Sequence, residues 1–237
     1  MRVKAAAEVR RLGFEPVPHI AARRIQSTGE LEEFLGGLES ADAARQVFVV
    51  GGDPSSPVGP YPDALSIIES GRLKRFGVEG VGIAGYPEAH PDIALGELWH
   101  HLEAKTAALA DQQLSGSIVT QFTFDTAPVL RYLTEVRERN ISTRVRVGVP
   151  GPAGIKRLLG FARKFGIGAN AMAVRKYGIS LTNLVGSTGP DRFMRDLSRQ
   201  LTDGSIGDVL VHFYTFGDVS ATADWARERL LDGVVDR

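Results

Sequence analysis

Residues Gln46 to Tyr61, QVFVVGGDPSSPVGPY, decide the fold of this chain. The apolar run Val47-Phe48-Val49-Val50 is typical of a strand that is buried on both faces. Gly51 and Gly52 follow it, and because they carry no side chain a flat ligand can approach the backbone closely. Asp53 then comes at the carboxyl end of the strand, where α/β sheets and barrels place their chemistry. The alternative is a plain strand-to-helix turn in which Asp53 only caps a neighbouring group.

The same strand–helix pattern continues on both sides of this stretch, and a Ser27-Thr28 pair predicts the start of the helix before it. We expect strands at residues 14–20, 46–50, 80–84, 117–124, 144–149 and 208–216, and helices at 3–12, 30–38, 62–70, 93–114, 127–139, 153–165, 191–201 and 220–231, with one or two short helices within 168–184. Strict alternation of strands and helices predicts a parallel sheet with right-handed crossovers.

An open doubly wound sheet and a (β/α)8 barrel both fit this alternation. No Gly-x-Gly-x-x-Gly or Walker A loop follows any expected strand, which favours the barrel. We therefore expect a single TIM-like α/β barrel domain over residues 1–237. Because a helix with no strand before it opens the chain, we expect the first two barrel strands to be missing, which leaves open edges that favour a homo-oligomer.

Composition excludes several classes of protein. The formal net charge of +0 gives no electrostatic case for binding nucleic acid or an anionic membrane. The chain has no cysteine, so disulfides and thiolate chemistry are excluded. No apolar run reaches transmembrane length and the N-terminus does not resemble a signal peptide, so we expect a cytoplasmic protein.

Polar residues gather near the expected strand ends. In chain order they are His19, Asp53, Tyr86 with Glu88 and His90, Gln121 with Asp125, and His212 with Tyr214. Parallel strands would bring most of them to one rim, which is the active-site face of a β/α barrel. Gln121 is the most informative, because an amide among apolar neighbours needs partners for both its oxygen and its nitrogen.

Several of these residues also have a plain structural interpretation. His19 could bond a loop carbonyl, and Glu88 or His90 could cap the next helix. We expect His100 and His101 to be solvated and His212 to be an interior histidine with a partner. The scattered histidines and acids predict no metal site, and no Gly-x-Ser-x-Gly elbow indicates a serine hydrolase.

Five motifs in this order resemble the methylenetetrahydrofolate reductase family. They are Pro-His at 18–19, Gly-Gly-Asp at 51–53, Gly-Tyr-Pro-Glu-Ala-His-Pro at 85–91, Val-Thr-Gln-Phe-Thr-Phe-Asp at 119–125 and His-Phe-Tyr-Thr at 212–215. The resemblance implies a β/α barrel that binds FAD and reduces 5,10-methylenetetrahydrofolate to 5-methyltetrahydrofolate, with NADH or NADPH as co-substrate.

The resemblance also implies roles for individual residues. Asp53 would lie near the flavin pyrimidine and Gln121 would bond the folate pterin, so both are expected to be catalytic. Phe122 and Tyr177 would contact the folate. The residues implied to line the FAD are His19, Gly51, Gly52, Asp53, Tyr61, Tyr86, His90 and Lys105, the last through the phosphates or the ribityl chain.

The chain departs from the family pattern in places. Gly51 stands where the family has an arginine, and Met172-Ala173-Val174 stands where the family has Met-Ala-Gln. The Phe-Glu-Phe-x-Pro-Pro motif, whose glutamate is the family's general acid, does not occur here. Two alternatives therefore stand beside the enzyme: a catalytically weak or silent folate- or flavin-binding protein, and a family member that works without flavin.

Overall fold

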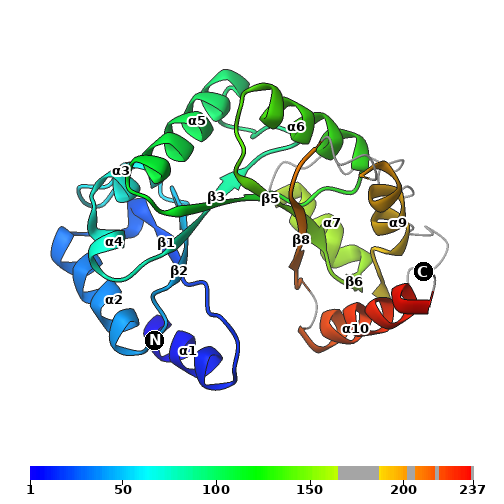
Figure 1. The fold of residues 1–237 in the computed structure, drawn as a ribbon, viewed down its shortest axis with the longest axis horizontal. Coiled ribbons are helices and arrows are strands. Elements are labelled where there is room, and N and C mark those ends of the chain that lie inside the picture. Colours follow the sequence, from blue (N-terminus) through cyan, green and yellow to red (C-terminus); the bar gives the residue numbers. More distant parts are fainter. Residues whose placement is uncertain (165–186, 202–205, 217–218, 236–237) are drawn as a thin grey trace. The chain divides into compact units, whose positions relative to one another are not determined.

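The computed structural model describes residues 1–164, 187–201, 206–216 and 219–235. Its main sheet has six strands in the order β1-β2-β3-β4-β5-β8 (Figure 1). The pairs β1–β2, β2–β3 and β5–β8 are parallel, so the predicted parallel α/β sheet is confirmed, and it fits a TIM-like barrel fold. The strands are β1 His19–Ala21, β2 Gln46–Val50, β3 Gly80–Gly85, β4 Ser115–Thr120, β5 Arg144–Pro150 and β8 Val209–Tyr214.

Helices alternate with these strands as expected. They are α1 Arg2–Arg11, η1 Ala22–Arg24, α2 Thr28–Ser40, α3 Ala64–Glu69, α4 Arg72–Arg75, α5 Leu95–Asp111, α6 Thr126–Glu138, α7 Ile155–Lys164, α9 Asp191–Gln200 and α10 Val219–Val235. A two-stranded antiparallel sheet of β6 Ala153–Gly154 and β7 Ser187–Thr188 was not predicted, because two-residue strands leave no periodic signal. The short helices expected within 168–184 lie outside the described residues.

Three expected strands have bounds that are wrong by two residues or more. The last of them is Val209–Tyr214 and not 208–216. The first is only His19–Ala21, because Pro16 and Pro18 have no N–H to offer a ladder. His19 therefore opens its strand and does not end it. The fourth stops at Thr120 and not at Phe124, so Gln121 begins the loop that follows.

The described chain separates into two compact units. The first is Met1–Gly85 with Gly96–Val119, and the second is Tyr86–Leu95 with Thr120–Arg237. Each unit is described by itself below. Among the described residues, no helix combines the length and the apolar character that a membrane span requires.

In the first unit, β2 buries Val47 and Val49 and leaves Phe48 half-buried on the opposite face. Helix α2 buries Leu31, Phe34, Leu35 and Leu38, and α3 buries Ile67 and Ile68. The predicted cap of α2 is confirmed, since Ser27 Oγ accepts a hydrogen bond from the Glu30 amide at 3.1 Å.

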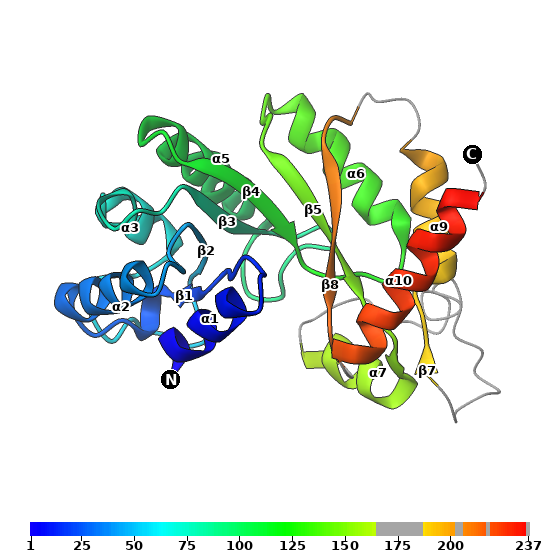
Figure 2. The ribbon, with the colours of Figure 1, turned by 60° about the horizontal axis from the view of Figure 1, so that its bottom comes forward.

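In the second unit, β5 and β8 run side by side with His212 opposite Gly148 (Figure 2). Helix α10 packs against β8 through the Phe213 and Trp225 rings, whose centroids are 5.4 Å apart. Trp225 also donates to Asp191 at the start of α9. These contacts join α10 to β8 and to the start of α9.

Candidate functional site

In the first unit, His19 and Phe48 lie on neighbouring strands with their ring centroids 4.8 Å apart. The Phe48 ring covers Gly82, where an added Cβ would come within 2.6 Å of it. Burial of the imidazole beside these groups lowers the pKa of His19, although the residue as a whole is exposed. At neutral pH this favours a neutral imidazole, which can both donate and accept a hydrogen bond.

The turn after β2 leaves the backbone accessible. A Cβ at Gly51 would meet no atom within 4 Å, and Gly52 has a φ of +95°. The Gly51 carbonyl accepts a bond from the Arg23 amide at 2.9 Å, which fixes the turn against η1. This geometry fits the expected close approach of a flat ligand, and a side chain at Gly51 would obstruct it.

Asp53 points into solvent. Its side chain is 93% exposed, and it forms an ion pair with Arg24 at 3.2 Å. An exposed pair of this kind contributes little to stability, so the structure gives Asp53 no structural task that would explain its position.

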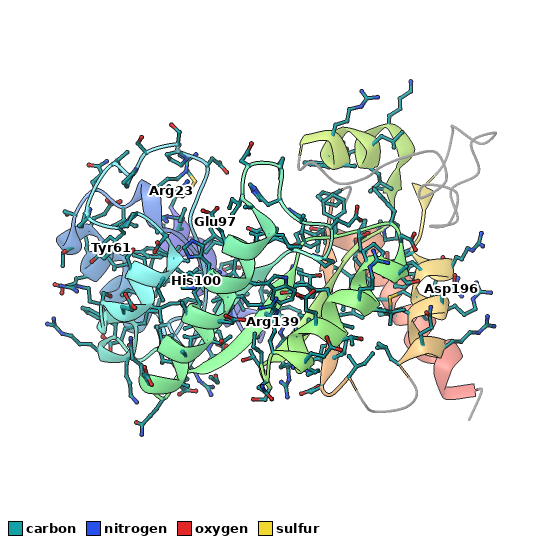
Figure 3. The ribbon with its side chains drawn as sticks, turned by 90° about the horizontal axis from the view of Figure 1, so that it is seen from above. Arg23, Tyr61, Glu97, His100, Arg139 and Asp196 are labelled. Carbon is teal, nitrogen blue, oxygen red and sulfur yellow. The ribbon has the colours of Figure 1, made fainter. Side chains whose placement is uncertain are left out.

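The polar atom of Tyr61 has a hydrogen-bond partner, whereas that of Lys105 has none among the described residues. Tyr61, labelled in Figure 3, is 5% exposed, and its hydroxyl lies 3.4 Å from Thr28 Oγ1. Lys105 on α5 forms no hydrogen bond or ion pair within the part of the chain that the structure describes. Burial lowers the pKa of its amine to about 8, against a smaller opposing attraction from Asp63. Lys105 is thus a half-buried cation that is available to an anionic ligand.

His100 and His101 lie on the exposed side of α5, with His100 labelled in Figure 3. Their ring centroids are 5.9 Å apart. The prediction that both are solvated is confirmed.

In the second unit, Tyr86 and His90 form a pair in the loop after β3. Their rings meet edge to face at 5.3 Å, and His90 Nδ1 accepts a bond from the Asp92 amide at 3.1 Å. In a neutral His90 the proton therefore lies on Nε2, which leaves that nitrogen able to donate to a ligand. Burial raises the pKa of Tyr86, so its phenol stays protonated and also remains a donor.

Gln121 follows β4 and is half-buried. Its Oε1 accepts a bond from the Phe122 amide at 3.1 Å. Its amide nitrogen donates to no other described residue, so the donor side of the carboxamide is available for a ligand.

Phe122 is packed in an aromatic cluster and is 1% exposed. Its ring lies 5.6 Å from Tyr214 and 4.8 Å from Phe216. The other residue expected to contact folate, Tyr177, lies outside the described residues.

Sequence reasoning missed two buried threonines of the second unit. Thr120 Oγ1 accepts a bond from the Gly148 amide at 2.8 Å, and its carbonyl accepts one from the Tyr214 hydroxyl at 3.0 Å. Thr123 donates its hydroxyl to Glu88 in the loop after β3. The contact of Thr123 with another loop was not predicted, because the alternating sequence up to Phe124 predicted a strand and gave no sign of a loop at Thr123.

No group of three or more His, Asp or Glu side chains that could hold a metal ion occurs in the described ranges. No protein-family model matches the chain.

The chain is similar to three plant proteins. Over 144 residues it is 33% identical to methylenetetrahydrofolate reductase (NADH) 1 of Zea mays, which covers 52% of this chain and 24% of that protein. It is 29% identical over 185 residues to a probable methylenetetrahydrofolate reductase (NADH) of Oryza sativa subsp. japonica, which covers 64% of this chain and 30% of that protein. It is 30% identical over 155 residues to methylenetetrahydrofolate reductase (NADH) 1 of Arabidopsis thaliana, which covers 57% of this chain and 25% of that protein. The chain thus matches between 24% and 30% of the length of these curated relatives.

Proposed function

We propose that this chain is a methylenetetrahydrofolate reductase-like flavoprotein with a β/α barrel fold. The observation that carries the proposal is the similarity to three reductases of that name. The placement of the family-like motifs supports it, since Gly51 to Asp53, Tyr86 to His90 and Gln121 each follow directly on a strand. The reaction is reduction of 5,10-methylenetetrahydrofolate to 5-methyltetrahydrofolate, in the cytoplasm.

The first-unit residues fit a bound FAD. Gly51 offers open backbone, His19 offers a neutral ring, and Lys105 offers a cation without a bonded partner among the described residues. We assign Lys105 to the FAD phosphates, because a desolvated cation is strongly attracted to an anion, or to the ribityl hydroxyls, to which its N–H groups can donate. Asp53 is assigned to the pyrimidine side, where its charge would tune the flavin.

In the second unit, Tyr86 and His90 would donate hydrogen bonds to the FAD. The available amide nitrogen of Gln121 would donate to the pterin of the folate. Tyr61, Phe122 and Tyr177 stay predictions as ligand contacts, since Tyr61 and Phe122 are buried and Tyr177 is outside the described residues.

When bound, FAD would supply the hydride chemistry by accepting hydride from a nicotinamide and delivering it to the folate. We propose NADH as the donor because the names of the similar proteins specify it. The chain's own residues bind and orient the two ligands. None of the described groups is assigned as the acid that opens the folate ring.

The purified protein itself tests this proposal. We expect an absorbance band at about 450 nm from bound flavin, and chromatography of the denatured protein should identify the released cofactor as FAD. NADH should bleach the band without oxygen. A colourless protein that takes up no added FAD yet reduces folate with NADH would instead support a flavin-independent member. A colourless and inactive protein would contradict the proposal.

A further inference from the structure

Glu88 and Thr123 join two loops of the second unit. Thr123 is 0% exposed, and its hydroxyl donates to Glu88 Oε1. Glu88 lies between Tyr86 and His90 in the loop after β3, whereas Thr123 lies two residues beyond Gln121 in the loop after β4. The bond therefore connects the loop assigned to the cofactor with the loop assigned to the substrate.

The turn that carries Glu88 contains a residue in a strained backbone conformation. Ala89 adopts a φ of 71°, which is unfavourable for a residue with a Cβ. The turn is closed by a bond from the Ala89 amide to the Tyr86 carbonyl at 3.3 Å and by the bond from Asp92 to His90. A strained turn persists when the surrounding structure holds it, and the bond to Thr123 is one such restraint.

Thr123 is in turn anchored to a helix. Its Oγ1 accepts a bond from the Asp125 amide at 3.2 Å, and Asp125 caps α6 by accepting from the Ala127 amide at 3.2 Å. The hydroxyl is thus fixed relative to the first turn of α6. Because the Thr123 hydroxyl is fixed, its part-buried bond to the Glu88 carboxyl limits where Glu88 can lie.

We propose that the Glu88–Thr123 bond is a clasp that holds the Tyr86–His90 turn in its ligand-binding conformation, with Thr123 as a positioning residue. The clasp presents the Tyr86 hydroxyl and His90 Nε2 together, which lowers the entropy lost when a ligand binds. Only the identity of the ligand, FAD, rests on the proposed function.

Amide exchange in the ligand-free protein tests the clasp without any cofactor. Thr123→Val removes the hydroxyl at nearly constant volume, and Thr123→Ser keeps it. In Thr123→Val we expect the Ala89 and Asp92 amides to exchange about tenfold faster or more, because loss of a bond to a charged group releases the turn. Thr123→Ser should exchange at the wild-type rate. Amides of β5 should be unchanged in both variants, which separates release of the turn from general unfolding.

FAD titration gives the second readout. We expect Thr123→Val to bind FAD about 10- to 100-fold more weakly and Thr123→Ser to restore the affinity. Unchanged exchange of Ala89 and Asp92 in Thr123→Val would overturn the clasp, and faster exchange with unchanged FAD affinity would overturn its role in positioning. Failure of the wild-type protein to bind FAD would contradict the proposed function, while the exchange data would still decide whether the clasp exists.

Discussion

At the scale of single residues, the environment of Lys105 differs strongly from that of an ordinary surface lysine. Its amine is largely desolvated, and burial brings its pKa down to about 8 despite the attraction of Asp63. Holding a charged amine in such a place weakens the folded state unless an anion binds there. The role of Lys105 as a FAD-binding residue stays a prediction, and its desolvated amine is the observation that favours it.

The lowered pKa of Lys105 predicts how stability depends on pH. Below pH 8 the amine is charged in both the folded and the unfolded chain, so the folded state bears the full desolvation cost. Between pH 8 and about 10.5 the unfolded chain holds more protons, so the free energy of unfolding rises with pH. Lys105→Met should be more stable than wild type by about 1–2 kcal/mol at pH 7, with the gap narrowing toward pH 10.

Urea unfolding at pH 7 and pH 10 measures this gap. Lys4→Met, which replaces an exposed lysine of α1, serves as the control and should leave the pH dependence unchanged. A stability gap between Lys105→Met and wild type that is the same at both pH values would show that the amine is not desolvated.

We predict that substitution by alanine has different effects at the two glycines after β2. Gly52→Ala places a Cβ at a φ of +95° and 3.1 Å from the Ala21 Cβ, so it should cost about 1–2 kcal/mol of stability. Gly51→Ala has open space and should change stability by less than about 0.5 kcal/mol. Because its methyl group would obstruct a flat ligand, Gly51→Ala should nevertheless weaken FAD binding. Thermal melting and FAD titration of both variants check this, and unchanged FAD affinity in Gly51→Ala would remove Gly51 from the site.

At the scale of elements, hydrophobic runs located each strand of the main sheet, but local chemistry set the strand ends. Prolines shortened the first strand to three residues. Strand β4 ends at Thr120 although the sequence beyond it still alternates like a strand. Phe122 and Phe124 are buried core side chains, but they lie in the loop after the strand. The position of Gln121 after a strand could be predicted from sequence. The bond from the Phe122 amide to its own neighbour Gln121 could not, because it depends on the rotamer that Gln121 adopts in the loop. The bond of Thr123 to Glu88 could not, because it depends on where two loops distant in sequence meet.

Thr120 at the end of β4 accepts a hydrogen bond from Gly148 of β5, and we predict that the folded state loses stability when this bond is removed. Thr120→Val would leave the buried Gly148 amide without an acceptor, which costs about 1–3 kcal/mol. Thr120→Ser keeps the acceptor and should lose less. Urea unfolding of the two variants separates the missing hydrogen bond from the missing methyl group, and equal stability of Thr120→Val and wild type would show that the Gly148 amide finds another partner.

At the scale of the whole molecule, the alternation of strand and helix patterns along the sequence predicted a parallel α/β protein, and that class is confirmed. The similarity to the plant reductases extends over 52% to 64% of the chain. Self-association through open strand edges stays a prediction that light scattering can examine. The ligand roles proposed for the residues of each unit rest on one proposal, which is that hydride passes from NADH to folate through FAD on this chain.

A single-turnover experiment without oxygen tests that claim most directly. Protein loaded with FAD and reduced by one equivalent of NADH is mixed with 5,10-methylenetetrahydrofolate, and flavin absorbance and folate products are followed together. We expect the flavin to reoxidise as an equal amount of 5-methyltetrahydrofolate forms, and Gln121→Leu to slow this step while FAD stays bound. Flavin that stays reduced in the presence of the folate, with no 5-methyltetrahydrofolate formed, would contradict the assigned function.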